Sequence, residues 1–320
     1  MYTTIEKIGD YPSPYRRVIL LALDGLGLYA KKLTDDGELP TFKRFWERSR
    51  SVFNARAQLP SNSAENWGSI LHGVVPKKHG LTNVIVNSGR PYDETNGFES
   101  VFKILEKRFK QVKLASFAAW ASINTGIIEQ SIPMERYAPT THESKPIQWW
   151  LWFKHRCLNN SAYDEYVVKK ACDYITKKEN SDVKLLSIHL VDVDEYGHGH
   201  GWGGKYYNKQ LRKMDTRINQ ILKAIDDAGW TDDSLVVMTT DHGGINKGHG
   251  GESIEEVSVF FSLLGPGLQK NGNIEEGVSN MDLAAIILKA LGVEAPEWFD
   301  AKLPNNIFDN SSLLLGEQVN

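Results

Sequence analysis

Acidic and histidine side chains gather in this sequence at short motifs that follow apolar runs. Asp24 follows VILLAL, Asp194 comes shortly after LLSIHL, and Asp241 follows LVVMT. Histidines stand in or near the same motifs: His198 in DEYGH, His242 in DHGG and His249 in KGHGG. Aspartate and histidine together suit borderline divalent metals, so the set predicts a metal centre that holds zinc, or else manganese.

Each motif also has an ordinary structural interpretation. A single Asp-Gly pair after a strand, such as Asp24-Gly25, is usually a turn, and a histidine in a Gly-rich loop is usually solvated. Three carboxylates after apolar runs, two of them with a histidine close by in the sequence, make that interpretation much weaker. We therefore expect these side chains to act together.

A candidate nucleophile, Ser63, lies in the segment LPSNSAENWG. Asn62 and Glu65 stand at the spacing of a capping box, which places Ser63 at the first position of a helix. Free N–H groups at a helix start favour an anion, and a metal beside Ser63 would lower the pKa of its hydroxyl. Taken alone, however, the local sequence favours a helix cap built by Ser61 and Ser63.

Buried strands must position these groups. Continuous apolar runs closed by turn residues are typical of strands inside a parallel sheet, and the intervening amphipathic segments predict helices on both faces. Carboxylates at several strand ends would then meet at one edge of the sheet, where ligands bind in open α/β folds. We expect strands over 18–23, 52–59, 112–117, 183–190, 234–239 and 257–264, and helices over 39–50, 64–71, 97–109, 163–178, 206–228 and 281–291.

The sequence predicts one domain over residues 1–320, a three-layer α/β/α sandwich with a mostly parallel central sheet. An acidic, Gly-rich loop is expected after residue 190. Residues of about 120–160 break the pattern and predict a small irregular insertion that caps the sheet edge. Its aromatic cluster at 149–153 fits a lid or a base- or lipid-facing wall, but packing of the insertion onto the core is the favoured interpretation. His155 and Cys157 are expected to be structural.

Composition narrows the function classes. The chain has 320 residues, a net charge of −3 and 41% hydrophobic residues, which fits a large core and no general nucleic-acid surface. Two cysteines make a disulfide framework improbable. No signal peptide or membrane-spanning run is present, so a cytoplasmic protein without a membrane partner is expected. The sequence gives no indication of oligomeric state.

The ordered motifs LALDG, SAENWGSILHG, DVDEYGH, TTDHGG and KGHGG resemble the alkaline phosphatase superfamily. The resemblance is greatest to its type I phosphodiesterase/nucleotide pyrophosphatase branch and excludes only about 85–180. It implies a two-metal hydrolase of small phosphate esters, most simply a phosphodiesterase that forms a phosphoseryl intermediate. Ser63 would be the nucleophile, and Asn66, three residues on, would bind a phosphoryl oxygen.

The same resemblance divides the ligands between two metals. One metal would be held by Asp24, Ser63, Asp241 and His242, and the other by Asp194, His198 and His249. His79 is expected to be structural, and His200 ranks below His198 as a ligand.

Several related chemistries are weighed against this one. The sulfatase pattern C/S-x-P-x-R is missing after Ser63, and no arginine lies in 61–73, which favours a singly charged diester over a monoester. Ala64 stands where the family has a substrate-binding aromatic, which weakens a case for base stacking. Phosphomonoesterase and phosphonate hydrolase remain alternatives, as does a non-catalytic metal- or ligand-binding protein. A serine triad hydrolase lacks its G-x-S-x-G motif here.

Overall fold

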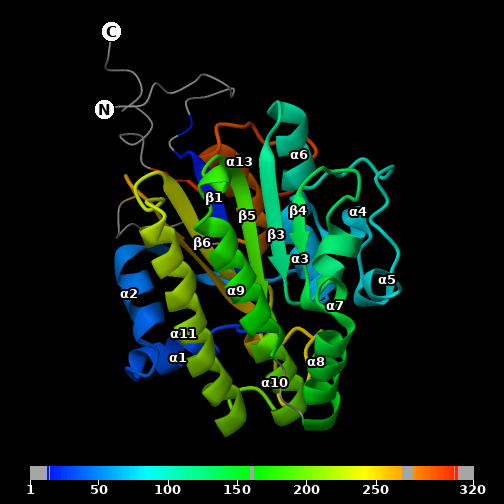
Figure 1. The fold of residues 1–320 in the computed structure, drawn as a ribbon, viewed down its shortest axis with the longest axis vertical. Helices are drawn as coiled ribbons and strands as arrows, with labels where there is room; N and C mark the ends of the chain where they lie inside the picture. Colours follow the sequence, from blue (N-terminus) through cyan, green and yellow to red (C-terminus); the bar gives the residue numbers. More distant parts are fainter. Residues whose placement is uncertain (1–12, 14, 159–161, 269–276, 306, 309–320) are drawn as a thin grey trace.

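The computed structural model describes residues 13, 15–158, 162–268, 277–305 and 307–308 (Figure 1). Within them lies a seven-stranded sheet of order β2-β7-β6-β1-β5-β3-β4. β7 is antiparallel to both of its neighbours and every other pairing is parallel, so the sheet is mostly parallel, as predicted. The strands are β1 (Arg17–Leu23), β2 (Arg50–Arg56), β3 (Lys113–Ala118), β4 (Glu135–Tyr137), β5 (Val183–Leu190), β6 (Ser234–Thr240) and β7 (Ser258–Leu264).

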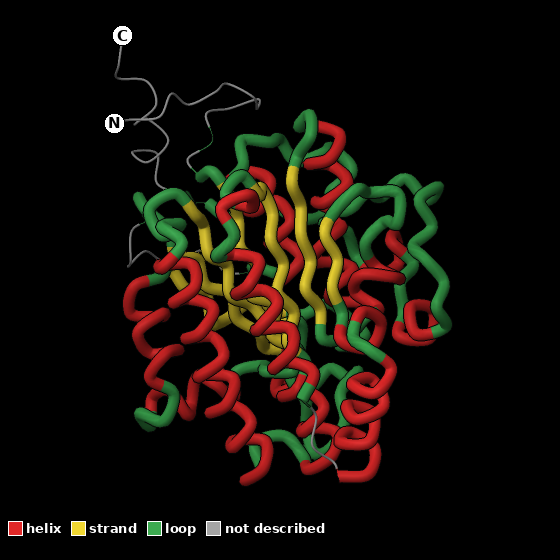
Figure 2. Tube along the Cα trace, viewed as in Figure 1, coloured by secondary structure: helices red, strands yellow, loops and turns green. Residues whose placement is uncertain are grey.

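Helices cover both faces of the sheet and enclose two apolar cores (Figure 2). One core packs against α2, α9 and α11, and the other against α3, α6 and α13, which confirms the three-layer sandwich. α11 buries Leu211, Met214, Ile218, Ile221 and Ile225 at helical spacing. These helices are α2 (Pro40–Arg48), α3 (Ser63–His72), α6 (Val101–Arg108), α9 (Tyr163–Ile175), α11 (Lys205–Asp227) and α13 (Leu283–Ala290).

Shorter elements connect this framework. Near the beginning of the chain, α1 (Tyr29–Asp35) packs beside α2, and α4 (Pro76–His79) and α5 (Asn83–Asn87) follow α3. Further short helices are η2 (Lys178–Asn180), α12 (Ile254–Val257) and η3 (Asn280–Asp282). Among the residues with a described structure, no helix combines the length and apolar character needed to cross a bilayer.

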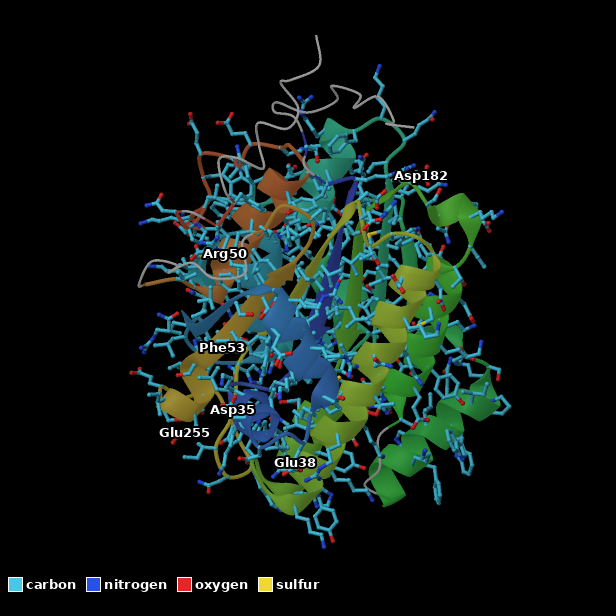
Figure 3. The ribbon with its side chains drawn as sticks, turned by 90° about the vertical axis from the view of Figure 1, so that its left-hand side faces the viewer. Asp35, Glu38, Arg50, Phe53, Asp182 and Glu255 are labelled. Atoms are coloured by element: carbon cyan, nitrogen blue, oxygen red, sulfur yellow. The ribbon has the colours of Figure 1, made fainter. Side chains whose placement is uncertain are left out.

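The central strand β1 is buried at all seven positions and lies between β5 and β6. Leu23 pairs with Leu190 on one side and with Thr240 on the other, so these three strands end level with one another. The residues that follow each strand therefore meet at one edge of the sheet. α12 lies at this edge, because the N–H of Gly243, two residues after Asp241, donates to the carbonyl of Glu256. In Figure 3, Glu255 of α12 is at the lower left, whereas Asp182, just before β5, is at the upper right.

Two segments differ from their predictions. The acidic, Gly-rich segment after β5 is the helix α10 (Asp192–His200), and not a loop. Residues of about 120–160 are also more regular than expected. They form η1 (Ile123–Ile127, a π-helix), β4, α7 (Pro139–His142) and α8 (Lys145–Leu158). β4 is itself part of the central sheet, so only α7 and α8 stand outside the layers.

The aromatic cluster on α8 does not pack onto the core, contrary to the favoured interpretation. Leu151 is buried, but Trp149, Trp150 and Trp152 are 62%, 41% and 52% exposed. The helix is amphipathic because Leu151 faces the protein while the indoles reach solvent. The side chains of His155 and Cys157 lie outside the described part of the structure, and Cys172 is a free thiol.

Candidate metal centre

The three predicted carboxylates converge because the strands end level. The N–H of Asp24 donates to the carbonyl of Leu190 at 2.9 Å, which continues the β1–β5 pairing by one residue. Asp241 follows β6, and its Oδ1 accepts from the N–H of Gly25 at 3.0 Å. Asp194 lies in the first turn of α10, the helix that begins two residues after β5 and lies at the lower end of the sheet in Figure 1. Segments far apart in the sequence thus bring three acids into one cluster.

Two overlapping groups of side chains have the spacing of metal ligands. The first comprises Asp24, Asp194 and His242, and the second Asp194, His198 and His249, each with its candidate ligand atoms within 4.8 Å of one another. Asp241 adjoins the first group, since its Oδ2 lies 3.2 Å from Nε2 of His242. All six side chains named from the sequence therefore lie together.

The histidines are held with one nitrogen turned toward the cluster. Nδ1 of His242 lies 2.8 Å from the carbonyl of Gly243, and Nδ1 of His249 lies 2.9 Å from that of Ser61. Nδ1 of His198 lies 3.1 Å from the carbonyl of Lys247. A carbonyl only accepts, so each Nδ1 carries the proton and each Nε2 keeps its lone pair. This tautomer is the one that binds metals, and such outer contacts commonly orient the ligand.

The Nε2 atoms crowd one another in a way that a cation would relieve. Nε2 of His198 lies 3.1 Å from Nε2 of His249, although neither atom bears a proton in this tautomer. The rings of His242 and His249 stack with centroids 3.8 Å apart. Burial, together with the neighbouring His249, lowers the pKa of His242 to about 3, so this ring is neutral at physiological pH.

Within the ligand cluster, two buried carboxylate oxygens have no hydrogen-bond partner, Oδ1 of Asp194 and Oδ2 of Asp241. Burial raises the pKa of both carboxyls well above the usual range, and the negative charge of Asp24 adds to the effect. An unpaired buried carboxylate is costly, and a divalent cation would compensate that cost. The residues present therefore fit a metal centre.

Gly25 allows the chains to approach at this point. Its φ of +68° favours glycine, and a Cβ there would lie 2.6 Å from Oδ1 of Asp194. Its carbonyl accepts hydrogen bonds from Nε1 of Trp202 at 2.8 Å and from the hydroxyl of Tyr207 at 2.9 Å. The Asp-Gly motif thus serves both as a turn and as a support for the acidic cluster.

Ser63 begins α3, as predicted, and its hydroxyl faces the cluster. Its Oγ lies 3.1 Å from Nε2 of His242 and 3.4 Å from Oδ1 of Asp24. The expected capping box is absent, because the side chain of Asn62 donates to Glu65 at 3.2 Å and caps no backbone N–H. The hydroxyl therefore points at the ligand cluster, as a metal-bound nucleophile would.

Asn66 does not fit the role given to it. It is completely buried, and its amide donates to the carbonyls of Gln58, Pro60 and Asn62. Its oxygen accepts from the N–H of Gln58 at 2.7 Å and from Nδ2 of Asn280 at 2.8 Å. An amide engaged in this way fastens the loop before α3 and has no free proton for a phosphoryl oxygen.

Asn83, and not Asn66, lies beside the candidate nucleophile Ser63. It starts α5, is half-buried, and its Oδ1 accepts from the N–H of Ala64 at 2.9 Å. This bond brings the amide next to Ser63 and leaves Nδ2 as a donor. The sequence does not signal this role, because twenty residues separate Asn83 from Ser63 and only the packing of α5 on α3 brings them together.

His189 was also missed. It stands in β5, buried, with Nε2 3.0 Å from Oδ2 of Asp24. Nε1 of Trp67 donates to the same oxygen at 2.9 Å, so Oδ1 of Asp24 is the atom left facing Ser63. A histidine inside an otherwise apolar strand was the available signal.

Other candidates lie outside the cluster. Asp192 forms a buried ion pair with Arg217 at 2.8 Å. His79 is buried with Nε2 3.2 Å from Ser69, in the structural role expected of it. The ring of His200 packs at a tilt against that of Tyr206, with centroids 4.7 Å apart, outside the cluster.

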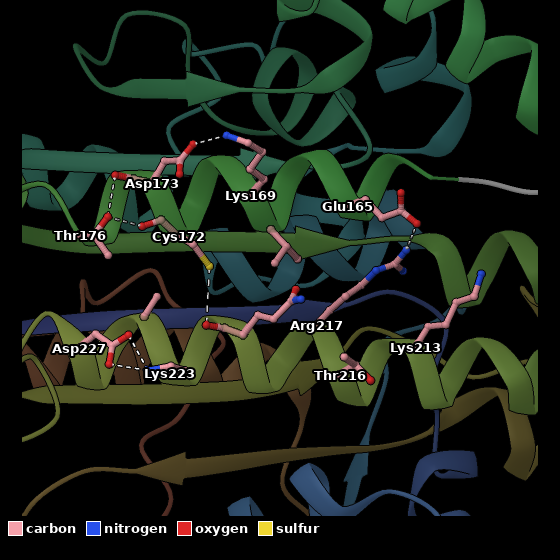
Figure 4. Close-up of a pocket in the computed structure, with 13 residues that line it drawn as sticks. Glu165, Lys169, Cys172, Asp173, Thr176, Lys213, Thr216, Arg217, Lys223 and Asp227 are labelled. Carbon is pink, nitrogen blue, oxygen red and sulfur yellow. Dashed lines mark hydrogen bonds and ion pairs between the residues drawn. The ribbon is translucent and has the colours of Figure 1, made fainter.

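A hollow of about 810 Å³ lies between α9 and α11, on the outer face of the helical layer (Figure 4). Lys169 pairs with Asp173 and Lys223 with Asp227 within their own helices, both at 2.7 Å, and Arg217 of α11 pairs with Glu165 of α9 at 3.5 Å. None of the candidate ligands lines it. We assign it no part in the chemistry of the metal centre.

Comparison with known proteins agrees with the fold and the motifs. The curated relatives that match include two of low identity. GPI ethanolamine phosphate transferase 1 of Emericella nidulans is 23% identical over 343 residues, covering 96% of this chain and 36% of that protein. Mouse ectonucleotide pyrophosphatase/phosphodiesterase family member 1 is 22% identical over 241 residues, covering 75% and 25%. The chain thus spans about a third or less of these relatives.

Solved structures share the fold at still lower identity. Murine ectonucleotide pyrophosphatase/phosphodiesterase 5, in complex with AMP, superposes with a TM-score of 0.67 at 14% identity, covering 88% of this chain and 96% of that one. A 2-O glycosaminoglycan sulfatase, BT1596, gives 0.66 at 11% identity, covering 90% and 73%.

Fold and motifs together define an α/β protein of the alkaline phosphatase superfamily, whose members here include phosphoester hydrolases and transferases. Residues 18–247 match the family model described as type I phosphodiesterase / nucleotide pyrophosphatase. This match takes in well over half of the chain, which therefore belongs to that family.

Proposed function

We propose that this chain is a two-metal phosphodiesterase in which Ser63 is the nucleophile. The observation that carries the proposal is the position of the Ser63 hydroxyl, within 3.4 Å of both Asp24 Oδ1 and His242 Nε2. The same cluster contains buried carboxylate oxygens that have no hydrogen-bond partner. Asp24, Asp241 and His242 would hold one ion together with Ser63. Asp194, His198 and His249 would hold the other, and zinc is the proposed metal, with manganese as the alternative.

The residues of this chain divide the work of the reaction. Bound divalent ions would lower the pKa of the Ser63 hydroxyl and stabilise charge on the departing oxygen. Ser63 Oγ then forms a bond to phosphorus while the bond to the leaving oxygen breaks, which leaves a phosphoseryl group. Asn83 Nδ2 would donate to a non-bridging oxygen, and the N-terminal end of α3 would favour its negative charge. Water then attacks phosphorus and releases Ser63.

The polar contacts support a diester in preference to a monoester. In the described part of the chain, the side-chain partners of Ser63 are Asp24 and His242, with no arginine or lysine among them. A monoester dianion usually needs a nearby cation, while a diester carries a single charge. The amide of Asn83 is a neutral donor, which suits the smaller charge.

Group transfer is a second candidate. GPI ethanolamine phosphate transferase 1 is similar to 96% of this chain, so the similarity to a transferase includes the whole metal centre. The same phosphoseryl group could pass to an alcohol instead of water. The two outcomes differ only in the acceptor, and the metal centre is the same in both.

A substrate panel tests the proposal. The metal-loaded protein is assayed on a p-nitrophenyl monoester, a diester, a nucleotide-derived diester and a phosphonate, and again after chelation. We expect the diesters to be cleaved fastest and all activity to disappear with the metal. Faster turnover of the monoester would refute the diester assignment, and activity that survives chelation would refute the metal mechanism. Adding ethanolamine to the diester assay distinguishes transfer from hydrolysis.

A further inference from the structure

We infer that helix α8 docks the protein onto the surface of an anionic lipid bilayer. Trp149, Trp150 and Trp152 reach solvent from this one helix, at 62%, 41% and 52% exposure. Leu151 between them is 1% exposed and anchors the helix to the protein. Three indoles displayed together are not explained by folding, since hiding them would stabilise the chain.

The aromatic side chains of α8 are arranged as a continuous surface. Trp149 stacks on Phe153 with ring centroids 5.5 Å apart and an angle of 16° between the planes. Nζ of Lys154 lies 4.4 Å from the centre of the Trp150 ring, in a cation–π contact. A basic group thus borders the indoles on the helix itself, and indoles bordered by lysines are typical of segments that lie at the membrane interface.

The charge of α8 is opposite to that of the chain. The helix sequence KPIQWWLWFKHRCL contains two lysines and one arginine and no acidic residue, whereas the whole chain has a net charge of −3. A cationic helix complements an anionic surface although the chain as a whole is acidic. A nucleic acid would offer the same charge, but its extended polyanion would meet the acidic remainder of the protein. A bilayer also accepts the indoles into its interfacial region.

The docking helix lies at the end of the molecule that carries the metal ligands (Figure 1). α8 ends at Leu158, and the chain from there to Asp164 covers at most about 20 Å. Asp164 accepts from the N–H of Val191 at 2.8 Å, three residues before Asp194. A protein resting on α8 would bring its metal centre near lipid headgroups, whose phosphodiesters match the proposed substrate class. Only this consequence rests on the proposed function; the docking itself does not.

Sedimentation with vesicles tests the docking without any need for catalysis. The full chain is mixed with vesicles of phosphatidylcholine, with or without phosphatidylserine, and the pelleted fraction is measured. We expect binding that increases with phosphatidylserine and falls as salt is added. The double variant Trp149→Ser/Trp152→Ser should bind at least about tenfold more weakly to both vesicle types. Lys154→Glu should lose about tenfold on the phosphatidylserine vesicles alone.

Ile254→Ser is the matched control, since Ile254 is 72% exposed but belongs to α12. It should bind as the unaltered chain does, and circular dichroism should show all variants folded. The inference is overturned if the chain does not pellet, or if the tryptophan variant binds as well as the unaltered protein. It is also overturned if the variant instead loses binding to a single-stranded oligonucleotide or loses self-association. Unchanged cleavage of a soluble diester by the tryptophan variant would show that docking and catalysis are separable.

Discussion

The imidazole of His189 lies 3.0 Å from Oδ2 of Asp24, on the neighbouring strand of the sheet, and both side chains are 1% exposed. With Nε1 of Trp67 on the same oxygen, it directs the other oxygen of Asp24 toward Ser63. Burial by itself would raise the pKa of Asp24, but the hydrogen bond and charge of His189 outweigh it and lower that pKa to about 2. His189 is thus a positioning residue for a candidate metal ligand.

Replacing His189 should weaken metal binding without removing a ligand. His189→Ala frees Asp24 to rotate, and we expect metal affinity to fall about 10–100-fold, the usual effect of losing an outer contact. Competition titration with a chelating dye measures it. His200→Ala is the control, since the ring of His200 packs against that of Tyr206 outside the cluster. Equal affinity in the two variants would show that His189 has no such role.

Ser63→Ala should remove turnover and leave the metals in place. The nucleophile supplies the bond-forming oxygen, so kcat should fall about 10³-fold or more, while the metal content stays close to that of the unaltered protein. Ser61→Ala is the matched control, because its hydroxyl donates to the carbonyl of Gly251. Ser63→Thr should retain part of the activity. Full turnover by Ser63→Ala would mean that no phosphoseryl group forms.

Asn83 and Asn66 should separate catalysis from stability. Asn83→Ala removes a donor beside Ser63, so kcat should fall about 10²-fold, and the loss of its single bond to the N–H of Ala64 should lower the melting temperature less than Asn66→Ala does. Asn66→Ala removes a buried amide that joins three backbone carbonyls, and should cost about 2 kcal/mol of folding free energy. Steady-state kinetics and thermal melts on both variants provide the test. If Asn66→Ala lost activity at full stability, Asn66 would bind a phosphoryl oxygen, as its spacing from Ser63 predicts.

In the metal-free protein, Asp194 and Asp241 should contribute a loss of stability as pH rises above 3.8, the ordinary pKa of an aspartate. Burial first, and the charge of Asp24 second, raise the pKa of Asp194 and Asp241 in the folded state, so the folded chain binds more protons there than the unfolded chain. Stability from such groups is present at low pH and lost as pH rises through the raised pKa. His242 and His249, whose pKa values are lowered in the folded state, act oppositely up to their ordinary 6.5, so the contribution of the two acids is measured as a difference between variants.

Denaturant melts of the metal-free chain measure this dependence. Relative to the unaltered chain, Asp194→Asn should lose less stability as pH rises, because it removes one of the two groups, and added zinc should abolish that difference. Glu255→Gln is a surface control with no expected change in slope. Parallel slopes for the Asn variant and the unaltered chain would show that the acidic cluster does not govern the pH dependence.

Buried strands were the part of this fold that local sequence could predict. VILLAL and LVVMT are apolar throughout because β1 and β6 are buried at every position, and their ends fixed the location of Asp24 and Asp241. α10 was mistaken for a loop because its acidic and glycine residues are common in loops. Tertiary contacts hold it as a helix, among them the bonds that Asp164 accepts from its first residues.

The parts of the site that were missed depend on contacts between distant segments. Asn83 lies beside Ser63 only because α5 packs against α3, and nothing in the sequence around it signals this. Asn66 has the spacing of a phosphate ligand but faces the loop it fastens. His189 looked like part of an apolar strand, and its partner is 165 residues away. Residue type and order thus indicated the ligands, while orientation required the fold.

Metal content tests the central claim most directly. Inductively coupled plasma mass spectrometry on the purified, zinc-reconstituted chain should find about two divalent ions per molecule. The double variant His242→Ala/His249→Ala removes one ligand from each proposed ion and should bind neither. His79→Gln/His200→Ala, two histidines outside the cluster, should retain both. An unaltered chain that holds no metal, or a His242/His249 variant with unchanged metal content, would contradict the account.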